Sequence, residues 1–136
     1  MIFLDSWVWI EFFEEGKKQE KADKILEAVN KGTDAVVSSV ALTEIKYIIT
    51  KKFGVEKAEE VLHKIESMPN LYIVPVSSEA AKLAADLRFK YYKKNYSVFS
   101  YIDMLNLAIA LLTNCEKFYT GDPEFRHIKE IETVII

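Results

Sequence analysis

Short strand-like runs alternate with helical patterns along the chain. Five runs rich in β-branched and aromatic residues, bounded by polar or turn residues, indicate strands. They are IFLDS, DAVVSS, LYIVPV, KFYT and ETVII, at residues 2–6, 34–39, 71–76, 117–120 and 132–136. Strands that alternate with helices favour parallel pairing, because parallel neighbours need a crossover connection. We therefore predict an α/β fold: a three-layer α/β/α sandwich with a central, mostly parallel sheet, formed as one domain over residues 1–136.

Helical spacing of apolar residues fills the intervals between these runs. The expected helices cover residues 7–15, 20–32, 40–53, 55–68, 77–94 and 100–113. The first three should stop at the glycines that end or follow them, Gly16, Gly32 and Gly54. For the third helix we expect Ser39 as N-cap and an apolar row made of Leu42, Ile45, Ile49 and Phe53. Ser77 or Ser78 should cap the fifth.

Composition argues against a membrane or secreted protein. The longest weakly charged stretch, residues 95–115, contains Asp103 and three asparagines, so it is a poor match for the ~20 apolar residues of a membrane span. We interpret it as a buried helix. The sequence starts with a strand-like run, without a basic region or a cleavage site, and its single cysteine, Cys115, has no internal disulfide partner. These features favour a cytoplasmic location.

The charge balance restricts how the chain can hold nucleic acid. The net charge of −3 gives no general attraction for a phosphate backbone. A local patch exists in RFKYYKKNY, residues 88–96, where four cations alternate with four aromatic residues. Within it Arg88, Lys90, Lys93 and Lys94 are candidates for RNA contact, as are Lys51 and Lys52. A solvated helix end, with lysines near the C-terminus of the helix dipole, explains the same patch equally well.

Four carboxylates fall at corresponding places in this scheme. Asp5 ends the first strand, Glu44 lies in the first turns of the helix after the second strand, Asp103 lies in the first turn of the apolar helix, and Asp122 follows the fourth strand. In parallel α/β sheets, ligands bind beyond the carboxyl ends of the strands. We therefore expect these four side chains to meet at one edge of the sheet.

Each carboxylate also has a purely structural explanation. Asp5 suits the N-cap of the helix that follows it, and Asp122 before Pro123 suits another. Asp103 forms the pattern of a capping box with Ser100. Glu44 lies at the edge of an apolar face and can be a surface residue. The functional interpretation differs from these four because it requires the side chains to converge.

Convergence would create a charge problem that a cation can solve. Two carboxylates ~5 Å apart repel by roughly 3 kcal/mol at an effective dielectric constant near 20. Either some of them are protonated or cations bind between them. Oxygen ligands favour Mg²⁺ or Mn²⁺ over zinc, and His63 and His127 are not spaced as a metal-binding pair.

These residues resemble the PIN-domain nucleases, and among them the small single-domain VapC-type toxins. The resemblance spans essentially the whole chain. Four motifs carry it in the order of the family: IFLDSWVWI, ALTEI, SYIDMLNLAIA and FYTGDPEF. Two departures affect the expected metal number and substrate: Trp7 and Trp9 follow the first aspartate, and Asn106 stands where some relatives have another acid.

The resemblance implies a function and a set of site residues. It implies Mg²⁺- or Mn²⁺-dependent cleavage of phosphodiester bonds, usually in RNA, by an endoribonuclease that is the toxin of a toxin–antitoxin pair. The family pattern makes Asp5, Glu44, Asp103 and Asp122 the acidic metal site and Ser6, Ser100 and Thr120 its supporting hydroxyls. It also implies a homodimer and a small antitoxin protein as partners.

Two other functions do not fit the sequence. A haloacid-dehalogenase-type phosphatase needs a second aspartate where Trp7 stands, and a response-regulator receiver needs an aspartate after the third strand, which ends in VPVSS. Two alternatives stay open: a non-catalytic PIN-fold module for RNA binding or assembly, and a stand-alone RNA-processing nuclease. The aromatic residues Trp7, Trp9, Tyr91 and Tyr92 fit core, interface or base-stacking positions, and we expect the tryptophans in the core.

Overall fold

The computed structural model describes residues 1–96 and 98–136. Five strands form one sheet in the order β3-β2-β1-β4-β5, and every pair of neighbouring strands is parallel. The strands are β1 (Ile2–Leu4), β2 (Ala35–Ser38), β3 (Leu71–Val74), β4 (Lys117–Thr120) and β5 (Glu132–Ile135). The parallel sheet predicted from the alternating pattern is confirmed.

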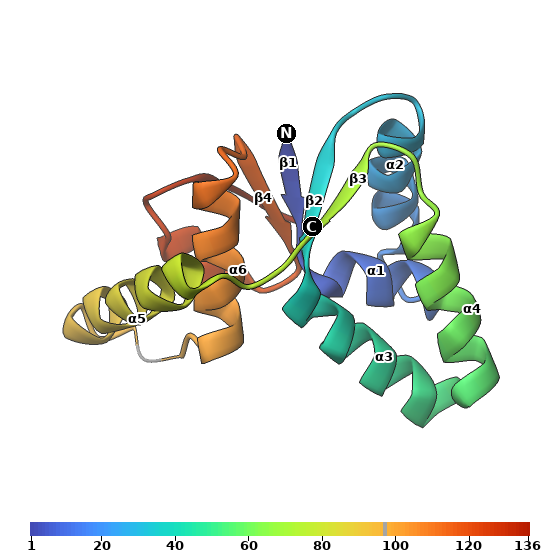
Figure 1. Ribbon diagram of the computed structural model, residues 1–136, viewed down its shortest axis with the longest axis horizontal. Coiled ribbons are helices and arrows are strands. Elements are labelled where there is room, and N and C mark those ends of the chain that lie inside the picture. Colours follow the sequence, from blue (N-terminus) through green and yellow to red (C-terminus); the bar gives the residue numbers. More distant parts are fainter. Residues whose placement is uncertain (97) are drawn as a thin grey trace.

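Helices cover both faces of this sheet (Figure 1). One face carries α1 (Ser6–Phe13), α2 (Gln19–Asn30), α3 (Ser39–Phe53) and α4 (Val55–Glu66). The other carries α5 (Ser78–Lys93), α6 (Tyr101–Leu112) and a short 3₁₀ helix, η1 (Pro123–His127). The fold is therefore the predicted three-layer sandwich.

Alternation along the strands explains the two cores. Successive strand residues point to opposite faces of the sheet. Phe3 and Val36 lie in the core under α5 and α6, whereas Leu4 and Val37 lie in the core under α1 to α4. Trp9 is fully buried in the second core, as expected. Both faces of the central strands are thus apolar, because both are covered.

Two details of α3 differ from the expectation. The N-cap is Ser38, not Ser39: the Ser38 hydroxyl accepts the Ala41 N–H at 3.0 Å. Ser38 ends β2 with extended backbone, so the helix starts one residue earlier than predicted. Phe53 does not belong to a buried row, since it is 51% exposed at the last position of the helix, where Gly54 turns the chain.

Other helix limits agree more closely. Ser77 caps α5, and Gly54, with φ of 93°, ends α3 as predicted. The first helix ends at Phe13, three residues before the predicted stop at Gly16. Within the described residues, no helix is both long enough and apolar enough to cross a lipid bilayer.

Candidate active site

The sheet reverses its strand order between β1 and β4. The chain proceeds from β1 outward to β2 and β3 on one side, and β4 and β5 lie on the other side. Where the order reverses, the connections leave in opposite directions and open a crevice beyond the carboxyl ends of the two strands. Asp5 follows β1 directly, Thr120 ends β4, and Asp122 comes two residues later. Two of the four predicted carboxylates therefore flank this crevice.

Asp5 serves as a helix cap and is also strongly perturbed. Its carboxylate accepts the Trp7 N–H at 2.9 Å, so the structural role proposed for it is confirmed. Burial, together with the charges of Glu44 and Asp103, nevertheless raises the pKa of Asp5 to about 7, although hydrogen bonds from Thr120 and Trp7 lower it. An N-cap aspartate on a solvated surface would not be desolvated in this way.

Glu44 reaches toward Asp5 from α3. The Ser6 hydroxyl donates to Glu44 Oε1 at 3.0 Å, which ties the start of α1 to α3. Burial raises the pKa of Glu44, the Ser6 hydrogen bond lowers it, and the charge of Asp103 raises it. Glu44 is therefore not a freely solvated surface residue. Ser6 supports it directly.

Asp103 begins α6 in the predicted capping box. The Ser100 N–H donates to Asp103 Oδ2 at 2.8 Å, and the Asp103 N–H donates to the Ser100 hydroxyl at 3.1 Å. Burial raises the pKa of the Asp103 carboxyl, hydrogen bonds from the backbone and the side chain of Ser100 lower it, and the charge of Asp122 raises it. The box fixes the position of a carboxylate that faces other carboxylates.

Asp122 starts η1 and is held by the end of β4. Its carboxylate accepts the Glu124 N–H at 2.9 Å, and its own N–H donates to the Thr120 hydroxyl at 3.1 Å. The same Thr120 side chain hydrogen-bonds Asp5. Thr120 thus links the loop after β4 to the aspartate after β1.

Trp7, near the start of α1, packs against the loop that follows β4. Its indole ring lies over Gly121, and a Cβ atom at that glycine would be 2.1 Å from ring atoms of Trp7. Only glycine leaves room for this contact between Thr120 and Asp122. The tryptophan after the first aspartate, a departure from the family pattern, is therefore a half-buried packing residue.

The four acids form one electrostatic group, which we call the acid cluster: Asp5, Glu44, Asp103 and Asp122. Repulsion connects Asp5 with Glu44 and Asp103, Glu44 with Asp103, and Asp103 with Asp122. None of the ion pairs that residues 1–96 and 98–136 form involves any member of the cluster. Its negative charge has no cationic side chain as a counterion in the described part of the chain.

The oxygen atoms of the acid cluster suit a hard cation, although the side chains do not form a complete metal site. Carboxylate and hydroxyl oxygens are the ligands of Mg²⁺ and Mn²⁺. Among residues 1–96 and 98–136, however, no three His, Cys, Asp or Glu side chains are placed to hold one ion together. Water or substrate oxygens can complete the ligand shell of such metals.

Sequence reasoning missed one polar pair beside the cluster. The Ser38 hydroxyl donates to Asn106 Oδ1 at 2.5 Å, and both residues are buried. Asn106 lies one turn after Asp103 on α6, and Ser38 ends the strand next to β1. The pair therefore fixes α6 against the sheet. The sequence pointed to this pair only through the adjacent serines Ser38 and Ser39, and the cap of α3 was predicted at Ser39 instead of Ser38.

The predicted basic residues do not form one surface. Lys51 and Lys52 lie at the end of α3, whereas the others lie on α5, across the sheet (Figure 1). Lys52 pairs with Glu14 at 2.8 Å, and Lys90 pairs with Glu130. Lys93 and Lys94 approach aromatic rings of α5, and Arg88 stacks on Tyr101.

Comparison with known proteins assigns the fold and the family. The family model of the PIN domain matches residues 2–131. Similar solved structures include VapBC2 from Rickettsia felis bound to a promoter DNA fragment, with a TM-score of 0.80 and 21% identity over 99% of this chain and 98% of that one. DNA-bound VapBC from Salmonella typhimurium gives 0.77 and 20% identity over 98% and 96%.

A third structure shares the same fold. VapC20 from Mycobacterium tuberculosis, a sarcin-ricin loop cleaving toxin, gives a TM-score of 0.76 and 15% identity over 96% of this chain and 98% of that one. The search of curated proteins gave no match. The family model covers almost the whole sequence and the sheet has the fold of these structures, so this chain belongs to the PIN domain family.

Proposed function

We propose that this protein is a metal-dependent endoribonuclease whose acid cluster holds Mg²⁺ or Mn²⁺ and hydrolyses phosphodiester bonds of RNA. One observation carries the proposal: at the crevice where the strand order reverses, burial and the charges of neighbouring acids raise the pKa values of three carboxyl groups, and these groups have no cationic partner among the described residues. Such unbalanced charge is costly to the fold unless a ligand compensates it.

The residues of the cluster have distinct tasks in this mechanism. Asp5 and Asp103 are the central metal ligands, and Glu44 and Asp122 complete the site directly or through water. A divalent cation, when bound, supplies positive charge against the scissile phosphate and makes water more acidic. Ser6 orients Glu44, Ser100 orients Asp103, and Thr120 holds Asp5 and the Asp122 backbone. Because these side chains are already held in position, they do not have to rearrange during the reaction.

The test compares cleavage of labelled RNA with and without metal. Wild-type protein should cut RNA with Mn²⁺ and not with EDTA, and Asp5→Asn should lose at least about 100-fold in rate, since it removes a central negative ligand. Asp23→Asn is the matched control, because Asp23 is exposed on α2, away from the cluster. Cleavage that survives EDTA and Asp5→Asn contradicts the proposal.

We further propose that the nuclease is the toxin of a toxin–antitoxin pair. The support is the likeness in fold to VapBC complexes and to a toxin–antitoxin complex from Klebsiella pneumoniae. A small antitoxin would cover the acid cluster, and the toxin would form a homodimer. Induced expression in a bacterial host should stop growth, and Asp5→Asn should not. A host that grows normally with active nuclease present contradicts the toxin role and favours a stand-alone RNA-processing enzyme.

A further inference from the structure

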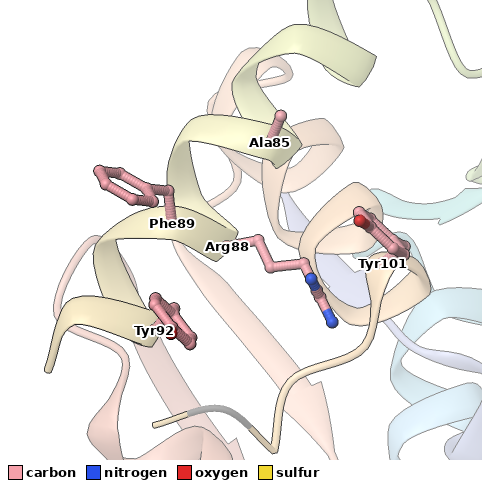
Figure 2. Close-up of a pocket in the computed structure, with 5 residues that line it drawn as sticks. All are labelled: Ala85, Arg88, Phe89, Tyr92 and Tyr101. Atoms are coloured by element: carbon pink, nitrogen blue, oxygen red, sulfur yellow. The ribbon is translucent and has the colours of Figure 1, made fainter. Parts of the chain in front are cut away.

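A second surface with the chemistry of a ligand site lies between α5 and the first turn of α6. A cavity of about 330 Å³ is lined by Ala85, Arg88, Phe89 and Tyr92 of α5 and by Tyr101 of α6 (Figure 2). We call Arg88, Phe89, Tyr92 and Tyr101 the aromatic platform. Phe89, Tyr92 and Tyr101 are 61%, 65% and 64% exposed. Three large rings around one hollow are more than isolated exposed hydrophobics, and such clusters mark binding surfaces.

Arg88 distinguishes this surface from a simple apolar patch. Its guanidinium lies 4.1 Å from the centroid of the Tyr101 ring, and Figure 2 shows it reaching from α5 toward that ring. Among residues 1–96 and 98–136 it has no acidic partner, and its Nε is buried without an acceptor. Lys90, two residues on, is by contrast paired with Glu130. Arg88 therefore offers a planar cation that no protein carboxylate occupies.

Charge decides which occupant fits the platform. Lys93 Nζ lies 5.5 Å from the centroid of the Phe89 ring, so a second cation lies next to a ring of the platform without lining the cavity. The residues lining the cavity include no acid. Aromatic faces together with unpaired cations match a flat, π-rich ligand that carries negative charge, which describes a nucleotide of a single strand.

The platform and the acid cluster share the first turn of α6. Tyr101 and Asp103 are two residues apart, and two helical steps place them on opposite sides of that turn. The separation is therefore about one helix diameter, roughly 10–12 Å. A strand cannot pass through the helix and has to run over its N-terminus, so its path is at least this long. Nucleotides of a stacked strand are spaced ~3.4 Å apart, so at least about three of them cover the path.

We propose that the aromatic platform binds an unpaired RNA base at least about three nucleotides from the phosphodiester bond that meets the acid cluster. Phe89, Tyr92 and Tyr101 provide the stacking faces, and Arg88 contacts the base edge or the adjoining phosphate. The proposal rests on the RNA-cleaving function proposed above and names how that substrate is positioned. A site of this kind favours single-stranded loops over duplex, because only unpaired bases expose their faces.

Binding of a labelled single-stranded RNA 12-mer, measured by fluorescence anisotropy in EDTA, tests the platform without cleavage. The variant Phe89→Leu/Tyr92→Leu keeps apolar volume and removes two π faces at exposed positions. It should weaken binding at least about fivefold. The slope of affinity against salt should not change, since no cation is removed. Tyr72→Leu, an exposed ring on β3, is the matched control and should bind like wild type.

Each outcome decides between the two proposals. Unchanged binding by the double variant overturns the platform, and the nuclease stands if Mn²⁺-dependent cleavage persists. Weaker binding with no cleavage by wild type supports the platform and overturns the nuclease. Weaker binding accompanied by a lower molar mass in light scattering overturns the platform, because the rings would then hold two protein copies together. Absence of RNA binding by wild type in EDTA overturns the platform, and cleavage with Mn²⁺ then decides the nuclease separately.

Discussion

The Asp5→Asn substitution should stabilise the folded protein at alkaline pH. The folded-state pKa of Asp5 is about 7 against an ordinary value of 3.8, so the folded chain binds more protons than the unfolded chain between these values. Stability contributed by this carboxyl is present below pH ~4 and is lost as the pH rises through about 7. The loss is about 4 kcal/mol, since one pKa unit corresponds to about 1.4 kcal/mol.

Asparagine removes this cost with little other change. It cannot ionise, and it is as good an N-cap as aspartate, so the hydrogen bond from Trp7 is retained. Urea unfolding of wild type and Asp5→Asn in EDTA at pH 5 and pH 8 should show a difference that grows with pH, up to about 4 kcal/mol in favour of the variant. Asp23→Asn should show no pH-dependent difference.

Metal should reverse the comparison. With Mn²⁺ at pH 8, wild type should gain stability with rising metal concentration, because a ligand that binds only the folded state stabilises it by mass action. Asp5→Asn should gain much less. A variant no more stable than wild type at pH 8, or a difference that does not depend on pH, would refute the assignment of Asp5 as a desolvated carboxylate.

Two further substitutions test how the site is held. Gly121→Ala should lower the free energy of unfolding by about 1–3 kcal/mol in urea and reduce cleavage, because the added methyl group meets the Trp7 ring. Trp7→Leu in the same chain should recover part of the lost stability. No recovery would contradict the steric cause. Ser38→Ala should lower the free energy of unfolding by about 1–3 kcal/mol, because it removes the cap of α3 and the hydrogen bond to Asn106 Oδ1. Ser39→Ala should lower it less. Equal losses would argue against Ser38 as the cap.

The layers of the fold were accessible from sequence because burial patterns are local. Both Phe3 and Leu4 are apolar, and continuous apolar strands occur where helices cover both faces of a sheet. The capping box at Ser100 was predicted from the sequence, since a cap depends on residues within one turn. The cap of α5 was narrowed to Ser77 or Ser78, and the structure selects Ser77. Ser38 was missed, because two adjacent serines satisfy the same local rule and only the end of β2 selects one.

The candidate site depended on longer-range information. Sequence order placed Asp5, Glu44, Asp103 and Asp122 near strand or helix ends, and each still had a structural explanation. Three of those explanations proved correct, since Asp5, Asp103 and Asp122 do cap helices. Capping and clustering are compatible, because a cap uses only part of the acceptor capacity of a carboxylate and leaves the rest directed outward.

The sequence by itself determined the alternation of strands and helices, the capping box at the start of α6, and the identities of the four acids. Tertiary structure alone decided which ends of strands are neighbours, that Trp7 closes on Gly121, and that Arg88 stands on Tyr101 without a carboxylate among the described residues. The physical reason is range: hydrogen bonds of a cap connect residues two or three apart, whereas desolvation, repulsion and close packing depend on segments brought together by the sheet.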